Sequence, residues 1–319
     1  MNRSRRLLQR GLPVVVSAGA LGALFAWVEP KALIDALSWK AAAVMVPALL
    51  LYGIVALVIE ARSILLLTAA PPDVFDTWTA ARIKCASYLL GIVNYALGVG
   101  ALTVLLRRRA GLRLAESASV VLFISAVDLL LLIAATALGI AASETDTATD
   151  FAGVVALTGV AGLGGLALLR APTSLGPLEK IRSLVVFQAV RDTPLGTIGR
   201  VGALRVAFLI AFIGVAIATF YAFDIAVPLP VLVAGMMIAA LVAALPIAVA
   251  GLGTGQWTVV TIFRDYASAE ALLTASLVLS TGMIVLRVGM GLLFAREFAR
   301  EALEEARGEP LDETGEEPA

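Results

Sequence analysis

Four charged side chains interrupt apolar stretches of the sequence: Glu60, Arg62, Asp128 and Arg287. A charge is expensive in hydrocarbon, so such residues usually pair with one another or line the path of an ion or substrate. Asp128 and Arg287 each stand in the middle of an apolar run, which favours an ion pair or a shared cavity between them. Glu60 and Arg62 are two residues apart and point in different directions on a helix, so they need separate partners. Arg62 could instead extend toward the cytoplasmic face, and a purely structural pair of Asp128 and Arg287 stays open.

The stretch 231–263 is uncharged and too long for a single membrane-crossing helix, which needs roughly 20 residues. Pro246 and three glycines interrupt it near its middle. Helices that break at membrane depth lie inside protein or beside a water-filled cavity, and in transporters they point to the binding site. The free N–H groups where the second half-helix starts would favour a phosphate or another anionic headgroup. A second apolar stretch, 83–106, contains a similar Gly-x-Gly element, and we pair it with 231–263. The candidate substrate-binding residues of the two stretches are Asn94, Gly98, Gly100, Gly251, Gly253, Thr254, Gly255 and Gln256.

A structural interpretation of the same residues is nearly as strong. Small residues let helices approach closely in membranes, so the two Gly-x-Gly elements also fit simple helix packing. The polar side chains of Asn94, Thr254 and Gln256 could line a cavity or could satisfy the broken backbone.

The composition predicts an integral membrane protein, all-helical and crossing the membrane several times. Hydrophobic residues make up 60% of the chain, charged residues 15%, and the mean hydropathy is +0.97. The absence of histidine excludes His-based catalysis and His-ligated metals, and the single cysteine, Cys85, excludes an intrachain disulfide. Nucleotide-binding, zinc-protease and serine-hydrolase motifs are missing. We therefore expect no enzyme activity, no cofactor, no metal and no nucleic-acid partner.

The distribution of Lys and Arg decides the predicted topology. If each of eight apolar segments crosses once, the best arrangement places 13 cations inside and 9 outside. If 83–106 and 231–263 instead enter and leave on one side, the split becomes 19 to 3, with both termini cytoplasmic. We expect this second arrangement, with an uncleaved first helix at about 11–28. The apolar segments lie at about 11–28, 41–69, 83–106, 116–140, 151–169, 202–223, 231–263 and 270–295.

This topology predicts two inverted repeats, each with the order span, span, re-entrant hairpin, span. Repeat one covers about 11–140 and repeat two about 151–296, and the hairpin tips meet near the midplane. An offset of 155 residues aligns ALGVGALTVLL (96–106) with GLGTGQWTVVT (251–261), with five identities. The single transmembrane domain would span 1–296, with an interfacial helix at about 176–191 and an acidic cytoplasmic tail at 297–319.

Two segments together resemble the lysylphosphatidylglycerol synthase transmembrane-region family: LPIAVAGLGTGQWTVV (245–260) and NYALGVGALTVLLRRRAGLRLAESASVVLFISAVDLLLL (94–132). Pro246, Gly251, Gly253 and Asp128 match that family's pattern. The sequence departs from it at Asn94–Gly100, where the family has Pro-Gly-x-x-Gly-Glu, and at Gln256, where the family has Glu. By this resemblance the chain is a stand-alone member that lacks the soluble synthase domain.

The resemblance implies a flippase-like transporter in the plasma (inner) membrane that moves a polar- or anionic-headgroup lipid between leaflets. Its partners would be membrane lipids, with a homo-oligomer or a membrane enzyme partner left open. A small-solute secondary transporter and a non-transporting partner subunit are the alternatives.

Overall fold

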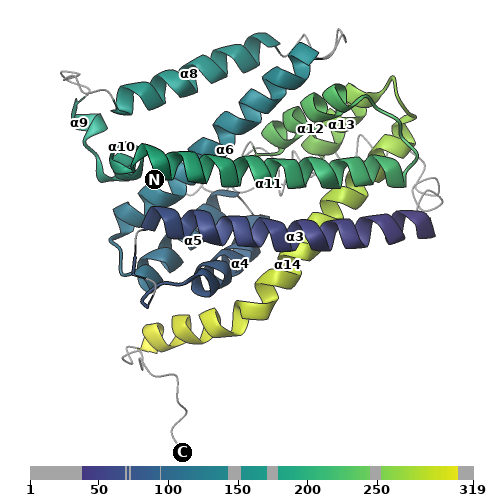
Figure 1. Ribbon diagram of the computed structural model, residues 1–319. Coiled ribbons are helices and arrows are strands. Elements are labelled where there is room, and N and C mark those ends of the chain that lie inside the picture. The colour runs from purple at the N-terminus through teal and green to yellow at the C-terminus, as the bar shows by residue number, and fades with distance from the viewer. Residues whose placement is uncertain are drawn as a thin grey trace, which may run out of the picture.

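The computed structural model describes residues 38–68, 70–71, 73–93, 95–142, 152–170, 179–244 and 253–307, and all regular elements in these ranges are helices (Figure 1). Four described helices are long and apolar enough to cross a membrane, as the hydropathy predicts: α3 (Trp39–Thr68), α6 (Leu114–Ala142), α11 (Leu195–Ala222) and α14 (Ala269–Arg307) as far as Phe294. The chain is therefore an all-helical membrane protein. The first predicted segment, 11–28, lies outside the described residues.

Each of the two interrupted segments forms a pair of shorter helices that pack on each other. α4 (Thr77–Val93) and α5 (Tyr95–Ala110) lie on either side of residue 94, and α12 (Leu229–Ala244) and α13 (Thr254–Phe263) on either side of 245–252. The Thr79 N–H donates to Asp76 Oδ1 at 2.8 Å and so caps the start of α4. Hydrogen bonds from Thr79 also hold the pKa of the Asp76 carboxyl below its ordinary value.

α3 and α11 lie side by side along their length and run antiparallel (Figure 1). The Thr219 hydroxyl lies 3.2 Å from Met45 Sδ, and the rings of Tyr52 and Phe212 are 6.4 Å apart. The facing pairs, in order along α3, are Lys40 with Asp224, Met45 with Thr219, Tyr52 with Phe212, and Glu60 with Arg205. This register brings position 60 of α3 opposite Arg205, about three turns from the start of α11.

The order of elements is the same in two halves of the chain. The first half, α3 to α6, begins its helices at Trp39, Thr77, Tyr95 and Leu114. The second half, α11 to α14, begins its helices about 155 residues later in each case, at Leu195, Leu229, Thr254 and Ala269. The packing between the halves is reciprocal, since α4 packs on α14 and α12 packs on α6.

Glycines allow these reciprocal contacts. A Cβ on Gly139 of α6 would lie 2.7 Å from the backbone nitrogen of Ala234 on α12. A Cβ on Gly291 of α14 would lie 2.6 Å from the Leu89 side chain of α4. Both helix pairs thus approach more closely than a larger residue at these positions would permit.

The segment between α8 (Ala152–Arg170) and α11 differs from the expected single helix over 176–191. Its described part contains two short helices, α9 (Glu179–Arg182) and α10 (Gln188–Asp192), and a 3₁₀ turn, η2 (Val185–Phe187). Side chains from other elements bind its backbone: Arg170 donates to the carbonyl of Val190 at 2.6 Å, and the Ala189 N–H donates to Ser119 Oγ at 2.6 Å. These contacts satisfy backbone groups locally, so a continuous helix is not required.

Candidate functional site

Four charged side chains from four helices form one buried cluster, which we call the ion network: Glu60, Lys84, Asp128 and Arg205. Arg205 of α11 donates to Glu60 of α3 at 2.9 Å and to Asp128 of α6 at 3.4 Å. Lys84 of α4 lies 3.2 Å from the same Glu60 carboxylate. The network therefore joins three helices of the first half to one helix of the second half.

Helix packing brings these charges together. The antiparallel register of α3 and α11 places Arg205 opposite Glu60, and α4 packs against α3 on the side of Lys84. The Arg205 guanidinium also lies 5.8 Å from the Phe208 ring, one turn further along its own helix. A buried charge is tolerated when it is paired and hydrogen-bonded. With two cations and two carboxylates, the network meets this condition.

The two carboxylates differ in exposure. The Glu60 side chain is 7% exposed and bonds to both cations, whereas the Asp128 side chain is 34% exposed and makes one long contact to Arg205. Arg205 itself is 1% exposed, and its Nε–H has no acceptor among the described residues. Asp128 is thus the member of the network that a ligand or water molecule reaches most easily.

Tyr88 of α4 connects the ion network to Arg287 of α14. The Lys84 ammonium lies 5.5 Å from the centre of the Tyr88 ring, and the Arg287 guanidinium lies 5.8 Å from the same centre. Both distances fit cation–π contacts. Arg287 is exposed, although it stands inside a helix that is apolar enough to cross a membrane.

The expected pairing of Asp128 with Arg287 is wrong. Asp128 bonds to Arg205, while Arg287 lies against Tyr88. The reason is helix position: α14 packs on α4, so its arginine meets a side chain of the first broken segment instead of α6. Arg62 is exposed and lies outside the ion network, which agrees with its different direction from Glu60 on the helix.

The sequence did not reveal Arg205 and Lys84 as site residues, because both count among the cytoplasmic cations in the predicted topology. α11 begins at Leu195, directly after Pro194, and not near 202, so Arg205 lies three turns inside the helix. A Thr-Pro pair at 193–194 is a helix-start signal that could have revealed this. Removing these two cations from the count leaves the excess on the cytoplasmic side large.

The first broken segment differs from its predicted form. Gly98 and Gly100 were expected in the break, but both lie within α5, which begins at Tyr95. A Cβ on Gly98 would lie 2.7 Å from the Gly91 Cα of α4, whereas a Cβ on Gly100 would meet no atom within 4 Å. Gly98 therefore serves close helix packing. Asn94 lies outside the described residues.

In the second broken segment, α13 begins at Thr254, directly after Gly253. Gly253 has φ of 92°, a left-handed backbone that favours glycine. Gln256 is 1% exposed; its Oε1 accepts the Gly253 N–H at 2.7 Å and its Nε2 donates to Ser280 Oγ of α14 at 3.0 Å. Both ends of this side chain are thus used within the fold. Thr254 and Gly255 are half-buried, and Gly251 and Pro246 lie outside the described residues.

Replacing Gln256 with leucine is expected to lower the free energy of unfolding by about 1–3 kcal/mol, because it leaves the buried Gly253 N–H without its acceptor. The midpoint of thermal unfolding in detergent measures the effect. Thr261→Val on the exposed side of the same helix is the matched control, with an expected change of less than about 0.5 kcal/mol. Equal midpoints for the Gln256 variant and the wild type would contradict this role.

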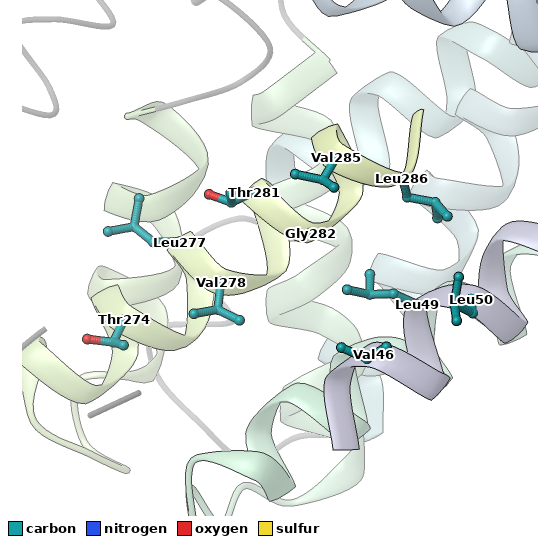
Figure 2. A pocket seen from close by; sticks show the side chains of 10 residues that line it. All are labelled: Val46, Leu49, Leu50, Thr274, Leu277, Val278, Thr281, Gly282, Val285 and Leu286. Atoms are coloured by element: carbon teal, nitrogen blue, oxygen red, sulfur yellow. The ribbon is translucent and has the colours of Figure 1, made fainter. Parts of the chain in front are cut away.

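An apolar groove of about 570 Å³ separates α3 from the first part of α14 (Figure 2). Figure 2 shows Val46, Leu49 and Leu50 of α3 facing the α14 side chains across it. Two threonines, Thr274 and Thr281, are the polar side chains of its lining. Val46 and Leu50, at the rim of the groove, are each more than half exposed. The groove therefore opens to the outside of the helix bundle.

Comparisons with known proteins add no assignment. No family model, no curated protein and no solved structure matches this chain. The ion network and the apolar groove between α3 and α14 are the structural features that bear on function.

Proposed function

We propose that the protein is a flippase-like transporter that moves a polar-headgroup lipid between the leaflets of the plasma (inner) membrane. The observation that supports this most is the ion network, in which Arg205 of the second half is held by carboxylates of the first half. Buried ion pairs add little to stability compared with a well-packed apolar core. Charges placed between two packed halves of a membrane bundle are instead typical of substrate or ion paths.

The packing of the halves supports two inverted repeats with re-entrant hairpins. Helices α4, α5, α12 and α13 have 17, 16, 16 and 10 residues, fewer than the roughly 20 that cross a bilayer. The antiparallel pairing of α3 with its counterpart α11, and the reciprocal packing of each hairpin on the other half, fit a twofold axis in the membrane plane. In this arrangement both termini are cytoplasmic.

The groove between α3 and α14 supports a lipid over a soluble solute. It lies along a seam between the two halves, and its outward-facing rims are apolar. Acyl chains can thus stay in contact with hydrocarbon while a headgroup passes through the bundle. A soluble solute would need no such lateral opening.

Within the proposed cycle, the ion network controls access to the path. Asp128 holds Arg205 by its long contact, so a headgroup that reaches Asp128 competes for the guanidinium. The unused Arg205 Nε–H offers a further donor at the same place. Glu60 and Lys84 keep Arg205 positioned while Asp128 exchanges partners, because their contacts are shorter and more buried.

Reconstituted vesicles test this function. The protein is expected to expose fluorescent headgroup-labelled lipids of the inner leaflet to a membrane-impermeant quencher. Asp128→Asn is expected to slow this exposure at least tenfold, because it removes the charge that holds Arg205 while it preserves side-chain shape. Glu116→Gln, at the start of the same helix and paired with Arg113, is the control and should transport like the wild type.

If no lipid class is translocated by the wild-type protein, the proposed function is wrong. Uptake of a soluble solute by the same vesicles, without lipid movement, would favour the secondary-transporter alternative.

A further inference from the structure

Arg287 is the charge that the ion network leaves unmatched. Glu60 and Asp128 balance Lys84 and Arg205, and no carboxylate of the described residues lies within salt-bridge distance of Arg287. Together, the network and Arg287 contain three cations and two carboxylates. This part of the bundle therefore has a net charge of +1, which favours an anionic ligand.

The depth of Arg287 follows from an aromatic pair. The rings of Trp78 at the start of α4 and Phe294 of α14 are 5.6 Å apart, and Trp78 is 58% exposed. An exposed tryptophan beside a membrane helix is typical of the membrane–water interface. Arg287 precedes Phe294 by seven residues, so it lies about 10 Å deeper at the helical rise of 1.5 Å per residue.

The Arg287 guanidinium is directed away from this interface. α4 and α14 run antiparallel here, because Phe294 lies against Trp78, Gly291 lies near the carbonyl of Cys85, and Arg287 lies against Tyr88. Tyr88 follows Trp78 by ten residues, about 15 Å further along α4. An arginine that extended to the interface would lie near Trp78 and not over the Tyr88 ring. Arg287 thus presents an exposed cation inside the membrane.

We propose that Arg287, supported by the Tyr88 ring, binds the phosphate of an anionic lipid headgroup. The Arg287 guanidinium lies over the Tyr88 ring and uses one side for the Tyr52 hydroxyl, so its remaining N–H groups can match two phosphate oxygens in a bidentate contact. Lys84 does not compete, since Glu60 holds its ammonium at 3.2 Å. This assignment rests on the proposed function and names its substrate class.

The surroundings of Arg287 favour a phosphate that is attached to acyl chains. The apolar groove between α3 and α14 reaches Val285 and Leu286, directly before Arg287 on α14, and Val285 is 64% exposed. These apolar side chains offer contacts to hydrocarbon tails, whereas a free phosphate ion would gain nothing from them. The phosphate chemistry is shared by both sources, so the experiment separates them.

Equilibrium binding to the purified full-length protein in detergent tests the site, with phosphatidylglycerol, phosphatidylcholine and inorganic phosphate as probes. Native mass spectrometry gives the apparent Kd for each. Phosphatidylglycerol is expected to bind best, and Arg287→Gln to weaken it at least tenfold. Arg287→Lys should give an intermediate loss, because lysine keeps the charge but not the bidentate geometry. Arg62→Gln, a matched change of an exposed arginine on α3, should bind like the wild type.

Unchanged phosphatidylglycerol binding in a folded Arg287→Gln protein would overturn the site. Binding of inorganic phosphate without phosphatidylglycerol binding would overturn the lipid assignment. Failure of the site and failure of the proposed function are separable, because binding is measured without transport. Arg287-dependent lipid binding without lipid movement in vesicles would retain the site and reject the flippase. Lipid movement that Arg287→Gln leaves unchanged would retain the flippase and reject the site.

Discussion

Replacing Arg205 with methionine is expected to lower the free energy of unfolding by about 3 kcal/mol, the largest effect of any single change in the ion network. The guanidinium is almost fully buried, and its removal leaves Glu60 with one cation and Asp128 with none. Methionine retains much of the volume, so a packing defect contributes little. Thermal or detergent-induced unfolding of the purified protein measures the loss.

A double variant distinguishes lost charge pairing from lost packing. Glu60→Gln together with Arg205→Met leaves one cation, Lys84, and one carboxylate, Asp128, so the network is balanced again. We expect the double variant to recover at least half of the stability that Arg205→Met loses. Losses that simply add in the double variant would show that Glu60 and Arg205 are not coupled.

Alanine at Gly98 and alanine at Gly100 are expected to have opposite effects on stability. The new Cβ at Gly98 would lie 2.7 Å from the Gly91 Cα and 3.1 Å from the Gly91 nitrogen, and these backbone atoms cannot rotate away. The cost is about 1–3 kcal/mol. Gly100 is two residues further along α5, where a Cβ meets nothing within 4 Å. Alanine there should stabilise the protein by about 1 kcal/mol, since glycine is a poor helix former.

The two variants serve as controls for each other, because both change glycine to alanine in one helix. Unfolding midpoints that move in opposite directions would support the close approach of α4 and α5. Midpoints that rise together would show that Gly98 is not at a helix contact, and its assignment to packing would then be wrong.

Sequence patterns predicted the helices of this protein better than they predicted the ion-pair partners of its charged side chains. Hydropathy placed α3, α6 and α14 within a few residues at most ends, because a membrane-crossing helix needs a long apolar run. The partner of Asp128 could not be read in the same way. Arg205 and Arg287 are both arginines on later helices, and only the packing of α11 beside α3 decides between them.

The glycine elements show a second limit of sequence patterns. Gly98-x-Gly100 and Gly253-x-Gly255 look alike, yet the first lies inside a helix and the second begins at a helix start. A glycine is required both where two backbones approach closely and where φ is positive, so the residue type alone does not distinguish the two cases. Gln256 is similar: its polar amide fits a binding role, but the backbone of Gly253 uses it.

The two ion pairs that join α3 and α11 differ in strength. At one end Lys40 and Asp224 form an ion pair whose side chains are 41% and 80% exposed, and such a pair contributes at most about 1 kcal/mol. At the other end the buried Glu60–Arg205 pair resists separation far more strongly. Salt therefore screens the attraction of the Lys40–Asp224 pair and leaves that of the Glu60–Arg205 pair largely unchanged.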